Sequence, residues 1–143
     1  MDIQLTKGEN VYTESLHHVV ISTFAKKDVL HELEQRRNLY AYIAGIMANR
    51  NCKLFRIGGV ENHIHIAFDL NINIALASLV ADIKQASAIR ANILFSEFVG
   101  WQKGFSYFTL PTKDKHNIIE YIKNQEHHHK TKSLDDEIKT LTM

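Results

Sequence analysis

The sequence has few of the residues that place a protein in a specialised structural class. Its 143 residues include one cysteine, Cys52, and one proline, Pro111. A single cysteine excludes a disulfide framework and a cysteine-based zinc site. No apolar run approaches the ~18 residues that a membrane-spanning helix needs, and residues 1–12 lack the features of a secretion signal. We therefore expect a cytoplasmic protein with no membrane partner.

Neither sign of charge predominates. The formal net charge is +1, and 45% of the residues are hydrophobic and 23% charged. These values are typical of one folded domain with a real core rather than of a disordered chain. The near-neutral balance leaves the partner open, because nucleic-acid-binding domains are usually clearly basic. Histidine is the unusual residue type, with nine copies.

Hydrophobic periodicity predicts the order β-α-β-β-α-β-α-α. The first six elements match the split βαβ arrangement of an α+β, ferredoxin-like fold, in which two helices cover one face of a four-stranded antiparallel sheet. We expect a single domain over 1–143, ending in a helical tail at 126–143. The predicted strands are 16–24, 53–60, 63–70 and 105–110, and the predicted helices are 28–49 with Asp28 as N-cap, 74–95, 117–129 and a short one from Ser133.

Two histidines stand two residues apart in the third predicted strand, His63-Ile64-His65. Side chains at i and i+2 of a strand share a face. The helix-covered face would take Ile64, Ile66 and Phe68, which leaves both imidazoles on the open face. Two imidazoles so placed can share a metal ion. Taken alone, however, the pair is better explained as two exposed histidines that lie together by chance than as metal ligands.

Tyr121 and Gln125 are four residues apart in a predicted helix and therefore project from the same side of it. Taken alone, they also fit a half-buried tyrosine and a surface glutamine. The histidines at 127–129 follow directly. A histidine-rich metal patch is possible, but contiguous residues fan around a helix axis and cannot all bind one ion, so we interpret His127 as part of a solvated helix end.

Basic residues are scattered along the chain and some lie near aromatic ones. Such a set can hold a single strand of nucleic acid through phosphate contacts and base stacking, although solvated helix faces explain most of it equally well. The candidates are Lys26, Lys27, Arg56, Lys84, Trp101, Lys103 and Lys123.

Together these features resemble the single-tyrosine HUH transposases of small bacterial and archaeal insertion sequences, of the insertion-sequence-two-hundred type. His63-Ile64-His65 resembles the family's His-hydrophobic-His element, and YIKNQEHHHK resembles its tyrosine helix. SLVADIKQASA and GWQKGFSYFTL resemble the segments between them. The resemblance spans roughly residues 12–141, with the order and spacing of the motifs intact.

The resemblance implies a role for each of these residues. Tyr121 matches the nucleophile, and His63, His65 and Gln125 match the ligands of a divalent metal, Mg²⁺ or Mn²⁺. Family members are homodimers in which the tyrosine helix can complete the site of the partner subunit. They cut and rejoin single-stranded DNA at hairpin-bearing ends through a 5′-phosphotyrosine, in the cytoplasm of bacteria or archaea. The family often has an acidic residue where this chain has Asn62, to which the sequence assigns no role.

Two alternatives remain at this stage. One is a domesticated relative that nicks repeated palindromes without moving an element. The other is a non-catalytic ferredoxin-like module that binds single-stranded DNA or RNA. The central strands lack the aromatic-rich signature typical of such modules, which counts against the second alternative.

Overall fold

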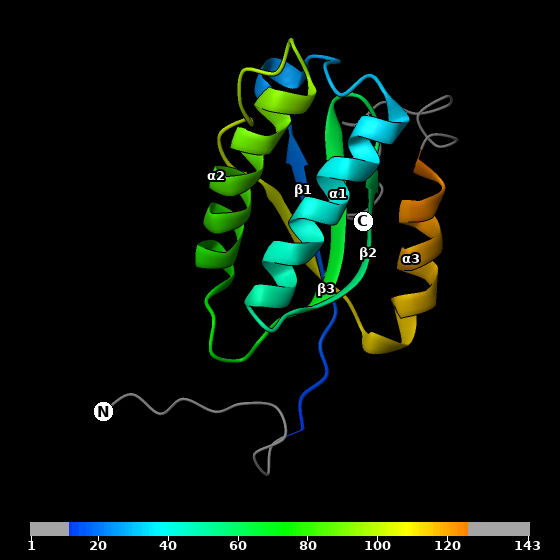
Figure 1. The fold of residues 1–143 in the computed structure, drawn as a ribbon. Helices are drawn as coiled ribbons and strands as arrows, with labels where there is room; N and C mark the ends of the chain where they lie inside the picture. The colour runs from blue at the N-terminus through cyan, green and yellow to red at the C-terminus, as the bar shows by residue number, and fades with distance from the viewer. Residues whose placement is uncertain (1–11, 126–143) are drawn as a thin grey trace.

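A four-stranded antiparallel sheet forms the centre of residues 12–125, the part of the chain that this computed structural model describes (Figure 1). Its strand order, β2-β3-β1-β4, places β2 and β4 at the edges. This order and the succession of helices confirm the predicted ferredoxin-like fold. The strands are β1 (His17–Ser22), β2 (Lys53–Gly59), β3 (His63–Asp69) and β4 (Ser106–Thr109).

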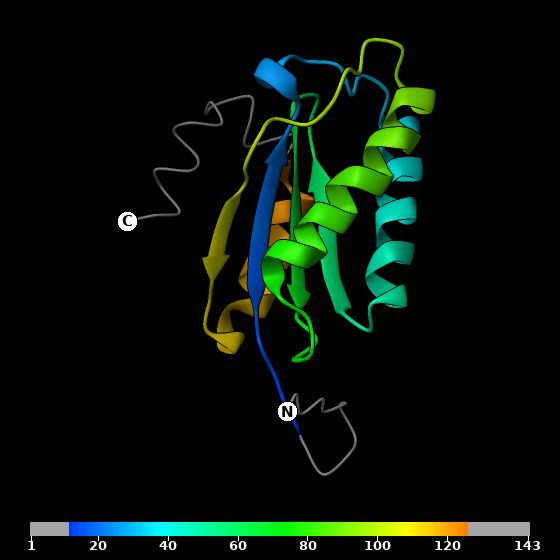
Figure 2. The same ribbon diagram turned by 90° about the vertical axis from the view of Figure 1, so that its left-hand side faces the viewer.

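Two long helices, α1 (Leu33–Asn49) and α2 (Leu76–Leu94), pack side by side on one face of the sheet (Figure 2). The strand residues beneath them are Ile64, Ile66 and Phe68, as their alternation along β3 predicts. The main hydrophobic core therefore lies between this face and the helices. The helix residues that close it include Leu39, Ile43, Met47, Leu79, Val80 and Ile83.

The opposite face is covered as well, by the third helix, α3 (Lys115–Lys123), drawn in orange in Figure 1. Ile118 and Ile122 of α3 pack with Leu16 and Ala67 in a second, smaller apolar cluster. Our expectation of an open face was therefore wrong. All seven residues of β3 are buried because helices cover both of its faces.

Helix α1 begins later than its apolar periodicity predicts. We expected a helix over 28–49 capped by Asp28, but α1 begins at Leu33 and its N-cap is Glu32. The backbone N–H groups of Val29 and Leu30 donate to the carbonyl oxygen of Glu61 at 3.1 and 2.9 Å. This contact with the β2–β3 loop holds residues 28–32 outside the helix, and the sequence around them gives no sign of it.

Short 3₁₀ turns precede α1 and α3, namely η1 (Phe24–Lys26) and η2 (Thr112–Asp114). Helix α3 begins at Lys115, two residues before the predicted start. The predicted end of this helix, the histidines at 127–129 and the helix expected from Ser133 lie outside the described residues.

None of the helices within residues 12–125 is both long enough and apolar enough to span a membrane.

Candidate active site

The two histidines of the HUH element lie side by side on the face of β3 that α3 covers. His65 is paired in register with Val20 of β1 and with Gly58 of β2, and His63 with Ser22 of β1. Both side chains are 0% exposed, and their ring centroids are 4.9 Å apart. The predicted pairing on one face is thus present, but it lies in a buried layer and not on an exposed surface.

Helix α3 brings the other two predicted site residues to these histidines. The Tyr121 ring stands edge-on to the ring of His65, at 5.7 Å between centroids and an interplanar angle of 87°. Gln125 is 1% exposed, and its Oε1 lies 3.4 Å from Nε2 of His63. The amide Nε2 of Gln125 donates to the Tyr121 carbonyl oxygen at 3.2 Å. Four residues from two distant segments of one chain therefore meet.

Two glycines in β2 leave room for close neighbours, Gly58 for α3 and Gly59 for the backbone of β3. A Cβ atom on Gly58 would lie 3.1 Å from both Cγ2 and the carbonyl oxygen of Ile122. A Cβ atom on Gly59 would collide with the carbonyl oxygen of His63. The sequence indicates the Gly-Gly pair only as a turn signal, but both residues lie within β2 and provide space for their neighbours.

A third histidine, His18 of β1, belongs to the same buried layer and is missing from the sequence-predicted set. It is 0% exposed, and its Nε2 lies 2.8 Å from Nδ1 of His65. Its ring is edge-on to Tyr121 at 6.3 Å and tilted against Phe108 at 5.7 Å. His18 reaches the site because β1 pairs with β3. The sequence signal for it is therefore only that His18 lies within a predicted strand.

Asn62, the residue before the HUH element, contacts the other ring nitrogen of His63. Its Oδ1 lies 2.7 Å from Nδ1 of His63. Its Nδ2 donates to the carbonyl oxygen of Lys26 in η1 at 3.3 Å. Asn62 thus links the first histidine to the turn that follows β1.

One pair of donor atoms at this site has a separation that fits a divalent metal ion. Two ligands that are each about 2.1 Å from one ion, at angles of 90–110°, lie roughly 3.0–3.4 Å apart. The 3.4 Å between Nε2 of His63 and Oε1 of Gln125 agrees with that range. Within residues 12–125 no three His, Cys, Asp or Glu side chains are grouped to hold a metal. A three-ligand site here therefore needs the amide of Gln125 beside His63 and His65.

Comparison with known proteins agrees with this constellation. The family model described as Transposase IS200 like matches residues 11–125. The chain belongs to the IS200-like transposase family.

Two solved structures show the same fold as this transposase. A candidate transposase from Deinococcus radiodurans R1 superposes with a TM-score of 0.65 at 20% identity, covering 85% of this chain and 98% of that one. A REP-associated tyrosine transposase bound to a REP hairpin superposes with a TM-score of 0.60 at 17% identity, covering 87% of this chain and 74% of that one. No curated protein matches the chain.

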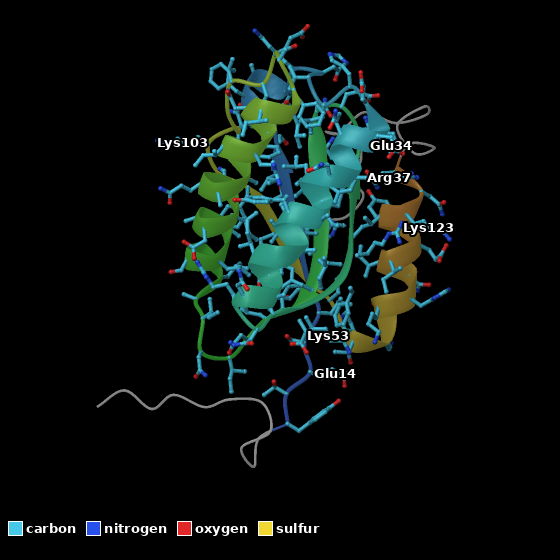
Figure 3. The ribbon with its side chains drawn as sticks, in the orientation of Figure 1. Glu14, Glu34, Arg37, Lys53, Lys103 and Lys123 are labelled. Atoms are coloured by element: carbon cyan, nitrogen blue, oxygen red, sulfur yellow. The ribbon has the colours of Figure 1, made fainter. Side chains whose placement is uncertain are left out.

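A cavity of about 420 Å³ opens beside the site of the transposase, between α1, the edge strand β2 and α3. Gln125, whose Oε1 faces His63, contributes to its wall, so the cavity lies next to the buried histidine layer. Arg37, Arg56 and Lys123 line it too and give it a basic character, although Arg37 also pairs with Glu34 at 3.0 Å. Figure 3 shows Arg37 on α1 and Lys123 on α3 on the same side of the molecule.

Two of the seven predicted DNA-binding residues have structural partners within the protein. Nζ of Lys84 donates to the carbonyl oxygens of Gln102 and Gly104 at 2.7 and 2.9 Å, and burial lowers the pKa of Lys84. Trp101 is half-buried, and its Nε1 donates to Oγ of Ser87 at 3.0 Å. Both residues therefore hold the segment before β4 against α2, and their contact with DNA stays a prediction.

The other five predicted DNA-binding residues are exposed and form no single patch. Arg56 and Lys123 line the cavity. Lys103 lies on the opposite side of the molecule from Lys123 (Figure 3). Lys26 and Lys27 follow β1, in and beside the turn that contacts Asn62. Only Arg56 and Lys123 are thus placed directly beside the candidate active site.

Proposed function

We propose that this chain is a metal-dependent single-stranded DNA transposase that cleaves and rejoins hairpin-bearing element ends through a 5′-phosphotyrosine. The observation that carries the proposal is the meeting of the tyrosine and three candidate ligands within one chain. The Tyr121 ring contacts His65, and Oε1 of Gln125 faces Nε2 of His63. The chain's membership of a transposase family supports the same conclusion.

The candidate ligands are His63, His65 and Gln125, which would hold Mg²⁺ or Mn²⁺. When bound, such an ion supplies a Lewis acid that polarises a phosphate oxygen and orients the phosphodiester. All three ligands are neutral, so we expect modest affinity. The side chains of His63 and His65 are buried, and Gln125 stands between them and the cavity.

Tyr121 would act as the nucleophile. A phenol is largely protonated at neutral pH, so attack requires loss of its proton. The phenolic oxygen forms a bond to phosphorus, the bond from phosphorus to the 3′-oxygen breaks, and that oxygen leaves as a hydroxyl group with one proton taken up. The phosphotyrosine retains the energy of the phosphodiester, so a new 3′-hydroxyl can reverse the reaction and join another strand without a nucleotide cofactor.

The DNA would approach along the basic cavity beside β2. Arg56 and Lys123 can contact phosphates there while Gln125 connects the cavity to the ligand layer. A related fold, the REP-associated tyrosine transposase, was solved bound to a REP hairpin. We propose a hairpin with an adjacent single strand as the substrate of this chain too.

The test is a covalent adduct between the protein and a hairpin-bearing single strand, measured on a denaturing gel in the presence of Mn²⁺. We expect Tyr121→Phe to abolish the adduct while DNA binding survives. Tyr42→Phe, at an exposed position on α1, is the matched control and should leave the adduct unchanged. If no hairpin from the flanking genomic DNA forms an adduct, the proposed enzymatic activity is refuted. If Tyr121→Phe retains the biological function of the protein, the non-catalytic binding module is favoured.

The homodimer implied by the family resemblance is a further part of the proposal. Mixing Tyr121→Phe subunits with His63→Ala subunits tests whether a tyrosine serves the partner's site. Recovery of adduct formation would show such an exchange, because each variant retains the part that the other lacks. No recovery would assign each tyrosine to the histidines of its own chain, as they are arranged here.

The domesticated nickase differs from the transposase in its products. A nickase that does not move an element would form the adduct without transferring it to a second strand. A strand-joining assay with two labelled ends therefore separates the two functions.

A further inference from the structure

The orientation of the Asn62 side chain is determined by a backbone carbonyl. Its Nδ2 lies 3.3 Å from the carbonyl oxygen of Lys26, which can only accept a hydrogen bond. The amide nitrogen must therefore face Lys26, and Oδ1 must face the His63 ring at 2.7 Å. Since Oδ1 is also only an acceptor, Nδ1 of His63 must carry the hydrogen.

This assignment determines what the other side of the His63 ring offers. A neutral imidazole with its hydrogen on Nδ1 presents a lone pair at Nε2. Nε2 of His63 faces Oε1 of Gln125 at 3.4 Å. The Gln125 amide is itself oriented by its donation to the Tyr121 carbonyl oxygen. Two acceptors thus face each other, an arrangement that is favourable when a cation lies between them.

His65 is held on the same side of its ring, by His18. The 2.8 Å contact joins Nε2 of His18 to Nδ1 of His65, and both side chains are 0% exposed. Metal-ligating histidines almost always donate their second ring N–H to a partner, which sets the tautomer and the ring orientation. The two histidines of the HUH element therefore share one pattern, a partner at Nδ1, which makes Nε2 of each ring the candidate ligand atom.

We propose that Asn62 and His18 are positioning residues that hold His63 and His65 by their Nδ1 atoms, so that both rings offer Nε2 to one divalent ion. The proposal rests on the proposed function for the presence of the ion and for the tautomer of His65, whereas the tautomer of His63 follows from the contacts of Asn62 alone. It gives a role to Asn62, where the family often has an acidic residue. In this chain an amide oxygen oriented by η1 accepts the N–H of His63.

The first measurement is the tautomeric state of the histidines in the metal-free protein, read from the ¹⁵N chemical shifts and couplings of the imidazole rings. We expect the Nδ1–H form for both His63 and His65. We expect Asn62→Ala to let His63 sample the Nε2–H form, while Asn62→Asp, which keeps an acceptor, retains the Nδ1–H form. A dominant Nε2–H form of either ring in the unaltered protein would overturn the proposal.

The second measurement is Mn²⁺ affinity by calorimetry, without DNA. Loss of a hydrogen-bonded partner of a ligand typically weakens metal binding about 10- to 100-fold, and we expect that loss for Asn62→Ala and for His18→Phe. Asn62→Asp should bind at least as tightly as the unaltered protein. His17→Gln, next to His18 on β1, is the control and should bind as the unaltered protein does.

The outcomes separate this proposal from the proposed function. If the unaltered protein binds Mn²⁺ and His63→Ala does not, but Asn62→Ala and His18→Phe bind normally, the positioning roles are refuted and the metal site stands. A second outcome is that no Mn²⁺ binds, although both rings show the Nδ1–H tautomer and Asn62→Ala changes the tautomer of His63. Metal dependence is then refuted, and the positioning of His63 by Asn62 stands. Circular dichroism of each variant confirms that it is folded.

Discussion

The two faces of β3 differ as much as any two regions of this molecule, although their residues alternate along one strand. Ile64, Ile66 and Phe68 enter the apolar core beneath α1 and α2. His63 and His65 enter a polar layer beneath α3. Both sets are almost completely buried. One strand can thus supply core residues from one face and candidate site residues from the other, because its side chains alternate.

The two faces also differ in how their burial is stabilised. Apolar side chains gain free energy on leaving water, roughly 25 cal/mol per Å². Imidazoles lose free energy unless each polar atom that is buried finds a partner. Asn62 and His18 provide such contacts at the Nδ1 atoms of His63 and His65. The polar layer is therefore tolerated by local hydrogen bonding, and the opposite face supplies the larger gain.

The largest effect on stability is expected on the apolar face. Ile64→Ala should lower the free energy of unfolding by about 2–5 kcal/mol, because it leaves a cavity in a packed core. Urea denaturation measures this change. Adduct formation per folded molecule should stay close to that of the unaltered protein at low temperature. A loss of less than about 1 kcal/mol, below the usual cost of such a cavity, would contradict the role given to this face.

Gly58→Ala tests how closely α3 must approach the sheet. The new Cβ would lie 3.1 Å from the Ile122 carbonyl oxygen, so α3 must shift by a few tenths of an ångström. We expect a loss of about 1–3 kcal/mol in stability. Adduct formation should fall by roughly 10- to 100-fold, since displaced reacting groups slow the chemistry.

The matched control is Gly45→Ala, on α1. A Cβ atom there would meet nothing within 4 Å, and the position lies within a helix. Alanine should raise the free energy of unfolding by about 0.5–1 kcal/mol and leave adduct formation unchanged. Equal activity of the two glycine variants would show that the close approach of α3 does not matter for catalysis.

His63→Leu should separate stability from chemistry on the polar face. Leucine keeps the buried volume but leaves Oδ1 of Asn62 without its donor, so we expect stability to fall by about 1–3 kcal/mol, with the protein still folded. Mn²⁺ binding and the DNA adduct should both be lost. Calorimetry and the gel assay measure these, and retained Mn²⁺ binding would remove His63 from the ligand set.

The smallest expected effect concerns His17 of β1, whose ring stacks on Phe68 and not on the histidine layer. Burial lowers the pKa of His17, and the nearby charge of Asp69 partly opposes this. The unfolded chain therefore takes up the proton first as the pH falls through the ordinary histidine range, so the folded state loses stability in that window. His17→Gln should show a smaller difference in unfolding midpoint between pH 7.5 and pH 5.5. An identical difference in both proteins would contradict the direction of this shift.

The sheet and the alternation of its residues could be predicted from the sequence because they depend on local periodicity. The pattern around His63-Ile64-His65 predicts which residues share a face, and the structure agrees. The covering of the histidine face by α3 could not be predicted in this way. It depends on Gly58 leaving space for a helix that is more than fifty residues away in the chain.

The remaining differences also arise from contacts between distant segments. Asp28 looks like an N-cap only until Glu61 binds the backbone N–H groups of Val29 and Leu30. His18 is an ordinary strand residue until β1 pairs with β3 and brings it to His65. The motif could therefore indicate the candidate ligands and the candidate nucleophile, but the residues that contact them depend on the tertiary structure.

The connection between β1 and α1 is expected to accept few insertions or deletions. Its backbone is joined to the β2–β3 loop at both ends, by Thr23 to the carbonyl oxygen of Asn62 and by Val29 and Leu30 to that of Glu61. Surface connections usually accept insertions and deletions readily. Here one added residue would displace the turn against which Asn62 is aligned. A change in length would therefore disturb the histidine layer indirectly, through the contact between Asn62 and His63. Natural or engineered length variants should therefore be tolerated at other connections before this one.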